Sequence, residues 1–342
     1  MADQAQPAWG SFPAEQYLIR NWDKHPHISP PERRLKLIED FLTLDVIPSE
    51  WDAVGPGADG RVLDILNPTP DQIETILRPW RPQSVRTLAA HIATVDSSED
   101  YVDSFWIRTH YAPNQEEKWQ ELLLEAPDSD RFSIDVEAPP QGLSEPSIFS
   151  SPGLTPEQAW DKALLYIPEA TGSRYKRRIK LASAADRAEA RSEIELHGAP
   201  RTWPEHDGCS PDLDKYRALH QVQMEATSCD VVIVDEEAFR TGEICLLSTD
   251  VRGNVVRWWR LTPEEIYSEL NTYSNDGTMD DVGLLEEMEG KQGTGEKYKV
   301  DGGELAGLVY GLGGRDRGEG EGEVDEDEDE DEDMGEDDDD EY

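Results

Sequence analysis

The run Val231-Val232-Ile233-Val234-Asp235 is the stretch that decides the fold. Four consecutive β-branched residues that end at an acid are typical of a strand covered on both faces. A half-buried strand would alternate apolar and polar residues instead. We therefore expect Val231 to Val234 to lie at the centre of a sheet.

Two more strands and a helix are expected after this run. Ile244 to Ser248 is largely apolar, and Val255 to Arg260 is rich in β-branched and aromatic residues. The glycine in Val251-Arg252-Gly253-Asn254 allows a turn between them, which predicts a hairpin. Thr262-Pro263-Glu264-Glu265 then predicts a helix, because threonine caps its start and proline fits the first turn.

The region before the run predicts strands and helices in alternation. Phe105 to Thr109 has the composition of a strand, Gln115 to Glu125 that of a helix, and Phe132 to Val136 alternates as a half-buried strand does. Residues 138–153 are rich in proline, glycine and serine and predict a long loop, and a helix is expected from Thr155-Pro156-Glu157-Gln158.

Helices from Ala182 to Leu196 and after Ser210-Pro211 complete the pattern. Residues 101–275 thus predict an α/β or α+β domain, with a mixed sheet of about five strands flanked by helices. Residues 1–100 predict a helical N-terminal region, whose helices begin near Ser29, at Thr69 and after Pro82. The Thr-Pro-acidic opening recurs at 69, 155 and 262, which we interpret as reuse of a favourable helix start and not as a repeat.

The charge of the chain is strongly negative and unevenly placed. The net charge of the 342 residues is −43, and 18 of the 24 residues in 319–342 are acidic, with no base. We expect 276–318 to be a flexible acidic linker and 319–342 a disordered acidic tail, because like charges repel and few apolar side chains are present. Residues 1–318 still hold 57 acidic against 32 basic residues, which disfavours binding of nucleic acid and favours basic partners.

The sequence predicts a cytoplasmic or nuclear protein. Its start has no basic region followed by an apolar core, and no apolar stretch approaches the ~20 residues that span a bilayer. Cys209, Cys229 and Cys245 form no Cys-x-x-Cys pair and are typical of reduced thiols.

Two blocks resemble a domain-of-unknown-function family found in bacteria and fungi. The first is Phe105-Trp106-Ile107-Arg108-Thr109 with the Trp119 helix that follows, and the second runs from Val231 through the hairpin to Pro263-Glu264-Glu265-Ile266-Tyr267. Together they cover roughly residues 100–275. The resemblance implies a domain boundary and brings no activity.

One set of residues could form a ligand site. Asp235, with Glu236 and Glu237 after it, ends the most apolar strand, and Arg108 and His110 lie at the end of another. If the two strands are parallel neighbours, Arg108, His110 and Asp235 could face one pocket, since ligands often bind at the carboxyl ends of such strands. The alternative, which we favour, is that Asp235 ends its strand by turn chemistry and that Arg108 pairs with it structurally.

Other candidate chemistry is weaker. His206, Cys209 and His220, with His197, would give zinc only one compact ligand pair, so we expect no metal. The sequence has no Gly-x-Ser-x-Gly motif, and we expect Cys229 and Cys245 to be unreactive thiols packed in apolar strands. Gly290 to Gly295 has the glycines of a phosphate loop but not its lysine, and we read it as linker; no cofactor is expected.

The basic stretch Arg174 to Lys180 could be a nuclear import signal or a nucleic-acid patch, but in so acidic a chain we favour a solvated face. The preferred function is a non-enzymatic binding or scaffold protein whose acidic tail takes basic partners. The alternative is an enzyme that uses Asp235 as base or ligand and Arg108 as an anion anchor.

Overall fold

The computed structural model describes residues 7–94 apart from 56, 102–125, 142–171, 175–177, 179, 182–197, 217–266, 292–298 and 309. Its strands form one mixed sheet in the order β2-β1-β3-β4-β5-β6. Their bounds are β1 (Val102–Arg108), β2 (Gly142–Leu143), β3 (Cys229–Val234), β4 (Ile244–Thr249), β5 (Val255–Leu261) and β6 (Gln292–Thr294). β1 runs parallel to β2 and β3, and the pairs from β3 to β6 are antiparallel. The predicted fold class, a mixed α/β fold, is confirmed.

The strand β3 is central, as its sequence predicts. It lies between β1, where Ile107 pairs with Ile233, and β4, where Cys245 pairs with Ile233. All six of its residues are buried. The strand at Phe105 to Thr109 and the hairpin of β4 and β5 are confirmed as well, with Gly253 at φ +81° in the turn.

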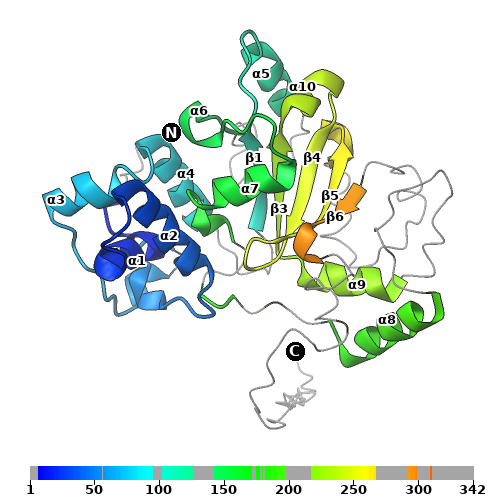
Figure 1. Cartoon of the computed structure of the whole chain (residues 1–342), viewed down its shortest axis with the longest axis horizontal. Helices are drawn as coiled ribbons and strands as arrows, with labels where there is room; N and C mark the ends of the chain where they lie inside the picture. The colour runs from blue at the N-terminus through cyan, green and yellow to red at the C-terminus, as the bar shows by residue number, and fades with distance from the viewer. Residues whose placement is uncertain are drawn as a thin grey trace, which may run out of the picture.

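Helices occupy both faces of the sheet and the N-terminal region (Figure 1). Their bounds are α1 (Pro13–Asn21), α2 (Pro30–Leu42), α3 (Pro70–Gln72), α4 (Gln83–Thr94), α5 (Glu116–Glu125), α6 (Pro146–Phe149), α7 (Pro156–Leu164), α8 (Ala184–His197), α9 (Arg217–Ala226) and α10 (Glu236–Thr241). The shorter turns are η1 (Trp22–Lys24), η2 (Ser49–Trp51), η3 (Ala58–Gly60), the π-helical η4 (Ile73–Leu77), η5 (Pro168–Ala170) and η7 (Glu296–Tyr298).

The two faces of the sheet carry separate apolar cores. On one face, Ile233 packs in a cluster with residues of α4, α6 and α7, among them Val85 and Trp160. On the other face, Val232 packs with residues of α5 and α10, among them Trp119. The alternation of Val232 and Ile233 between the two cores explains why the run is apolar throughout.

The N-terminal region is helical, as predicted, and it is joined to the sheet. α1, α2 and η4 share a cluster that includes Leu18, Ile38 and Leu77. The neighbouring α4 packs instead against the sheet, and the Trp80 Nε1 donates a hydrogen bond to the Leu165 carbonyl, 2.9 Å away, at the end of α7. Packing and hydrogen bonds therefore link residues on either side of the predicted boundary near residue 100.

The repeated Thr-Pro opening forms the same cap each time. The backbone N of Gln72, Gln158 and Glu265 donates to the hydroxyl of the threonine three positions earlier, at 3.2, 3.3 and 3.3 Å. The side chain of each of these residues accepts a hydrogen bond from the backbone N of that threonine in return. These reciprocal bonds satisfy amides that a helix start leaves open, which supports reuse of a favourable start.

Two predicted irregular segments contain regular structure. The expected loop 138–153 holds β2 and α6, and the expected linker 276–318 holds β6 and η7. β6 is the last strand of the sheet beside β5, and the backbone N of Gly295, which follows β6, donates to the Val256 carbonyl of β5 at 3.1 Å. The buried Tyr298 then donates its hydroxyl proton to Asp250 Oδ2 at 2.8 Å.

Two further predictions concern residues that the structure does not describe. The predicted strand Phe132 to Val136 and the predicted tail 319–342 lie outside the described residues. Among the helices that the structure describes, none is long and apolar enough to cross a membrane.

Candidate functional site

The carboxyl ends of β1 and β3 meet at one edge of the sheet. Arg108 pairs with Val234 in parallel register, and the backbone N of Thr109 donates to the Val234 carbonyl at 2.9 Å. Arg108 thus ends β1 and Asp235 follows β3, its parallel neighbour, which was the condition for a shared pocket. What remains is whether their side chains are available to a ligand.

Arg108 is buried and already bound. Its Nη1 donates to Glu116 Oε2 at 2.6 Å and its Nε donates to the His110 carbonyl at 3.0 Å. The guanidinium carbon also lies 4.9 Å from the ring centre of Tyr111 and 5.3 Å from that of Phe239. Aromatic faces and one carboxylate therefore replace water around this cation.

Glu116 is the exposed half of this pair. The hydrogen bond from Arg108 lowers the pKa of the Glu116 carboxyl, although 69% of its side chain is exposed. His110, the third predicted binding residue, is partly buried and its ring centre lies 5.9 Å from that of Phe239.

Asp235 is engaged in a different pair. Its Oδ1 accepts from the backbone N of Ala238 at 3.0 Å, so it caps α10. The same carboxylate binds Arg260 through both oxygens, with 2.7 Å from Nη1 to Oδ1. Within the described ranges, no ion pair links Arg108 to Asp235. The turn chemistry expected for Asp235 is present, but its structural partner is Arg260 and not Arg108.

The described residues give little support to a reactive cysteine or a metal site. Cys229 and Cys245 are buried, and burial raises the pKa of the Cys245 thiol to about 12, so the reactive thiolate is disfavoured. No group of three or more potential ligands gathers in the part of the chain that the structure describes. His206 and Cys209 lie outside the described residues, so the zinc alternative is not tested.

A small cavity lies elsewhere, between the N-terminal helices and the segment after α7. Its volume is about 30 Å³. The apolar part of its wall includes Pro13, Ala14, Phe41, Ile47, Ala93 and Pro168, and the polar part includes Asp52, Glu169, Thr171 and Arg177. No sequence motif predicted this cavity, because the residues that line it come from distant segments of the chain.

A network of buried charges lies behind the cavity. Glu169 Oε2 accepts from Arg81 Nη1 at 2.8 Å, and Arg81 also approaches Glu15 at 3.4 Å. Glu15 in turn accepts from Arg86 Nε at 2.7 Å. Burial acts to lower the pKa of Arg81, but attraction by Glu169 and Glu15 outweighs it and the pKa is raised.

Arg177 changes the interpretation of the basic stretch. Lys176 forms an antiparallel bridge with Val46, and the alternation of an extended chain turns Arg177 inward. Arg177 is only 1% exposed, and its Nη1 donates to the Leu42 carbonyl at 3.2 Å. The expectation of a solvated face is therefore wrong for Arg177, and Arg174, Arg178 and Lys180 lie outside the described residues.

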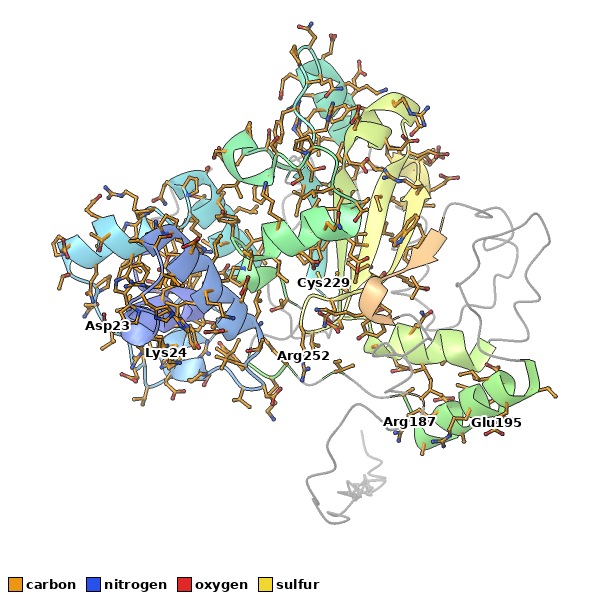
Figure 2. All side chains as sticks on the ribbon, viewed as in Figure 1. Asp23, Lys24, Arg187, Glu195, Cys229 and Arg252 are labelled. Carbon is orange, nitrogen blue, oxygen red and sulfur yellow. The ribbon has the colours of Figure 1, made fainter. Side chains whose placement is uncertain are left out.

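The same segment joins the N-terminal region to the hairpin. Arg252, in the turn between β4 and β5, donates from Nε to the Arg177 carbonyl at 3.0 Å and pairs with Asp45 at 3.0 Å. Figure 2 shows Arg252 at the end of the sheet that faces the N-terminal helices. The basic stretch thus serves, in its described part, as a structural connection.

Comparison of this chain with protein-family models, with curated proteins and with solved structures finds no match. The resemblance drawn from the sequence accordingly stays a prediction.

Proposed function

We propose that this protein is a non-enzymatic binding or scaffold protein whose acidic segment 319–342 binds basic proteins. The observation that carries the proposal is the density of charge in that segment, where 18 of 24 residues are acidic and none is basic. A dense anionic segment attracts lysine- and arginine-rich surfaces and raises their rate of encounter.

The strand-end residues favour this function over the enzyme alternative. Asp235 is held by Arg260 and caps α10, and Arg108 is bound to Glu116 and surrounded by rings. A general base or an anion anchor needs access to a substrate, and both side chains are instead used for internal pairing.

The test uses three forms of the chain: full length, 1–318, and full length with every acid of 319–342 changed to its amide. Binding to core histones is measured by fluorescence anisotropy over a range of salt. We expect the second and third forms to bind at least about tenfold more weakly at low salt, with the difference shrinking as salt rises. Equal affinity of all three forms would refute the proposal.

A further inference from the structure

Two of the residues that line the cavity between the N-terminal helices and η5 each hold a buried polar atom without a hydrogen-bond partner in the described part of the chain. Glu169 Oε1 and Arg177 Nε are both buried, and neither has a hydrogen-bond partner within the described part of the chain. Both residues line the cavity. Buried polar atoms are nearly always hydrogen-bonded, so such a pair calls for a partner. The acceptor and the donor belong to side chains that interact electrostatically but form no direct ion pair in that part of the chain.

The charges around the cavity fix the charge of that partner. Six charged side chains are fully or almost fully buried in the cavity wall and in the network behind it: Glu15, Asp52, Glu169, Arg81, Arg86 and Arg177. The three carboxylates balance the three guanidinium groups. An ion entering the cavity would leave this set with an uncompensated buried charge, which is costly, whereas a neutral molecule would not.

The other atoms of the cavity wall determine which hydrogen bonds the bound partner can form and how large it can be. Asp52 already accepts from the backbone N of Val54 and Gly55 and from the Tyr175 hydroxyl, at 3.0, 3.0 and 2.7 Å. Among the lining residues, the two buried side-chain atoms without a partner in the described part of the chain are thus one N–H, which needs an acceptor, and one carboxylate oxygen, which needs a donor. A cavity of about 30 Å³ holds two or three water-sized groups, at about 10–15 Å³ each.

We propose that this cavity is a binding site for a carboxamide group. The amide oxygen accepts from Arg177 Nε, the amide nitrogen donates to Glu169 Oε1, and the apolar walls contact the carbon. The group comes either from a small free amide or from an asparagine or glutamine side chain of a partner. So few atoms give millimolar affinity for the free amide.

The first test compares molecules of nearly equal shape on the full-length chain. Acetamide, acetate and acetone are titrated while the Arg177 Nε–H resonance is followed by NMR. Acetamide has a donor, an acceptor and no charge; acetate is charged, and acetone has no donor. We expect a saturable shift with acetamide, and about ten- to hundredfold weaker binding of the other two, because each leaves a buried group unsatisfied or unbalanced.

A variant of Glu169 tests binding separately from stability, because it should change which molecule the cavity prefers. Glu169→Gln removes one negative charge from the set while keeping the shape of the side chain. The site should then prefer acetate to acetamide, provided that thermal unfolding shows the variant to be folded. Should the variant fail to fold, the three-molecule series on the native chain still decides. No response of Arg177 to acetamide, or equal responses to acetamide and acetone, would overturn the proposal.

The source of the amide is then distinguished with blocked tripeptides. A glycine-flanked glutamine peptide that binds more tightly than acetamide, with its glutamate counterpart binding much more weakly, points to a partner side chain. Binding of acetamide without binding of the peptide points to a free small amide. Failure of both leaves water as the occupant and refutes a carboxamide site; the histone experiment above does not depend on this result.

Discussion

The sheet and the junction beside it bury their residues in opposite ways. β3 contributes Val231, Val232, Ile233 and Val234 to two apolar cores. The junction of the N-terminal helices with η5 buries charged side chains, which are joined across 66, 71 and 88 positions of the chain. The comparison teaches that burial alone does not define a core. The sheet derives its stability from removal of apolar surface, whereas the junction depends on the ion pairs that Glu15 and Glu169 form with its buried guanidinium groups.

The largest expected effect is a charge placed in the sheet. Ile233→Asp puts an unpaired carboxylate at a position that is 0% exposed. The cost of several kcal/mol is about the whole stability of a domain, so the variant should be unfolded in thermal and urea denaturation. The control is Val62→Asp, the same kind of change at a side chain that is 93% exposed. An Ile233→Asp chain that melts like the parent would contradict the central position of β3.

The second-largest loss of stability is expected when a charge is removed from the junction. Glu15→Ala leaves Arg81 and Arg86 without the carboxylate that they share. We expect a loss of about 3–5 kcal/mol in the free energy of unfolding, because a buried charge without its partner is strongly destabilising. Urea denaturation measures the loss.

The matched control for that change is Glu237→Ala, which breaks the exposed pair with Arg240. It should hardly move the denaturation midpoint, since water replaces the lost partner. If the two variants lose similar stability, the junction does not depend on pairing in the way described.

The sheet was largely predictable from the sequence and the junction was not. The apolar run of β3 and the glycine of the hairpin carry local signals whose meaning needs no other part of the chain. The three threonine caps were predictable for the same reason. Glu15 and Arg177 have no such signal, because a buried charged residue looks like a surface one until its distant partners are known.

The last strand of the sheet and the predicted site show the same limit of prediction from the sequence. β6 consists of Gln292-Gly293-Thr294, whose composition favours a loop, and it is a strand because β5 offers an edge to pair with. For the candidate site, adjacency of the strand ends was predictable from a parallel pair. The binding of Arg108 to Glu116 and of Asp235 to Arg260 was not, because it depends on how α5 packs beside β1 and on where β5 lies in the sheet.

A moderate effect is expected at Gly295, where the end of β6 pairs closely with β5. A Cβ at Gly295 would lie 1.8 Å from the Val255 carbonyl oxygen, a contact that only a shift of the backbone can relieve. Gly295→Ala should therefore cost about 1–3 kcal/mol and expose the amides of β5 to hydrogen exchange. Gly60→Ala is the control, because a Cβ there meets nothing within 4 Å and, as at Gly295, the backbone is not in the positive-φ region. Equal protection of β5 in parent and variant would place β6 elsewhere.

The smallest effect concerns a charge pair that is buried on one side only. Arg108 is buried, but its partner Glu116 is exposed, and the hydrogen bond from Arg108 lowers the pKa of Glu116 below its ordinary 4.5. A carboxyl with a depressed pKa in the folded state stabilises the fold above its unfolded pKa. That contribution is fully present above about pH 4.5 and is lost as the pH falls through the lower folded value.

Glu116→Gln should therefore destabilise the chain at neutral pH and lose its effect in acid. Because water screens the exposed carboxylate, we expect no more than about 1 kcal/mol at pH 7. Urea denaturation of parent and variant at pH 7 and near pH 3 measures the difference at both ends of the window. Glu117→Gln, a change at the next position of the same helix, is the control for a general change in charge, because Glu117 forms no ion pair with Arg108 in the part of the chain that the structure describes. A difference between parent and Glu116→Gln that is the same at both pH values would mean that the carboxylate does not act through its charge.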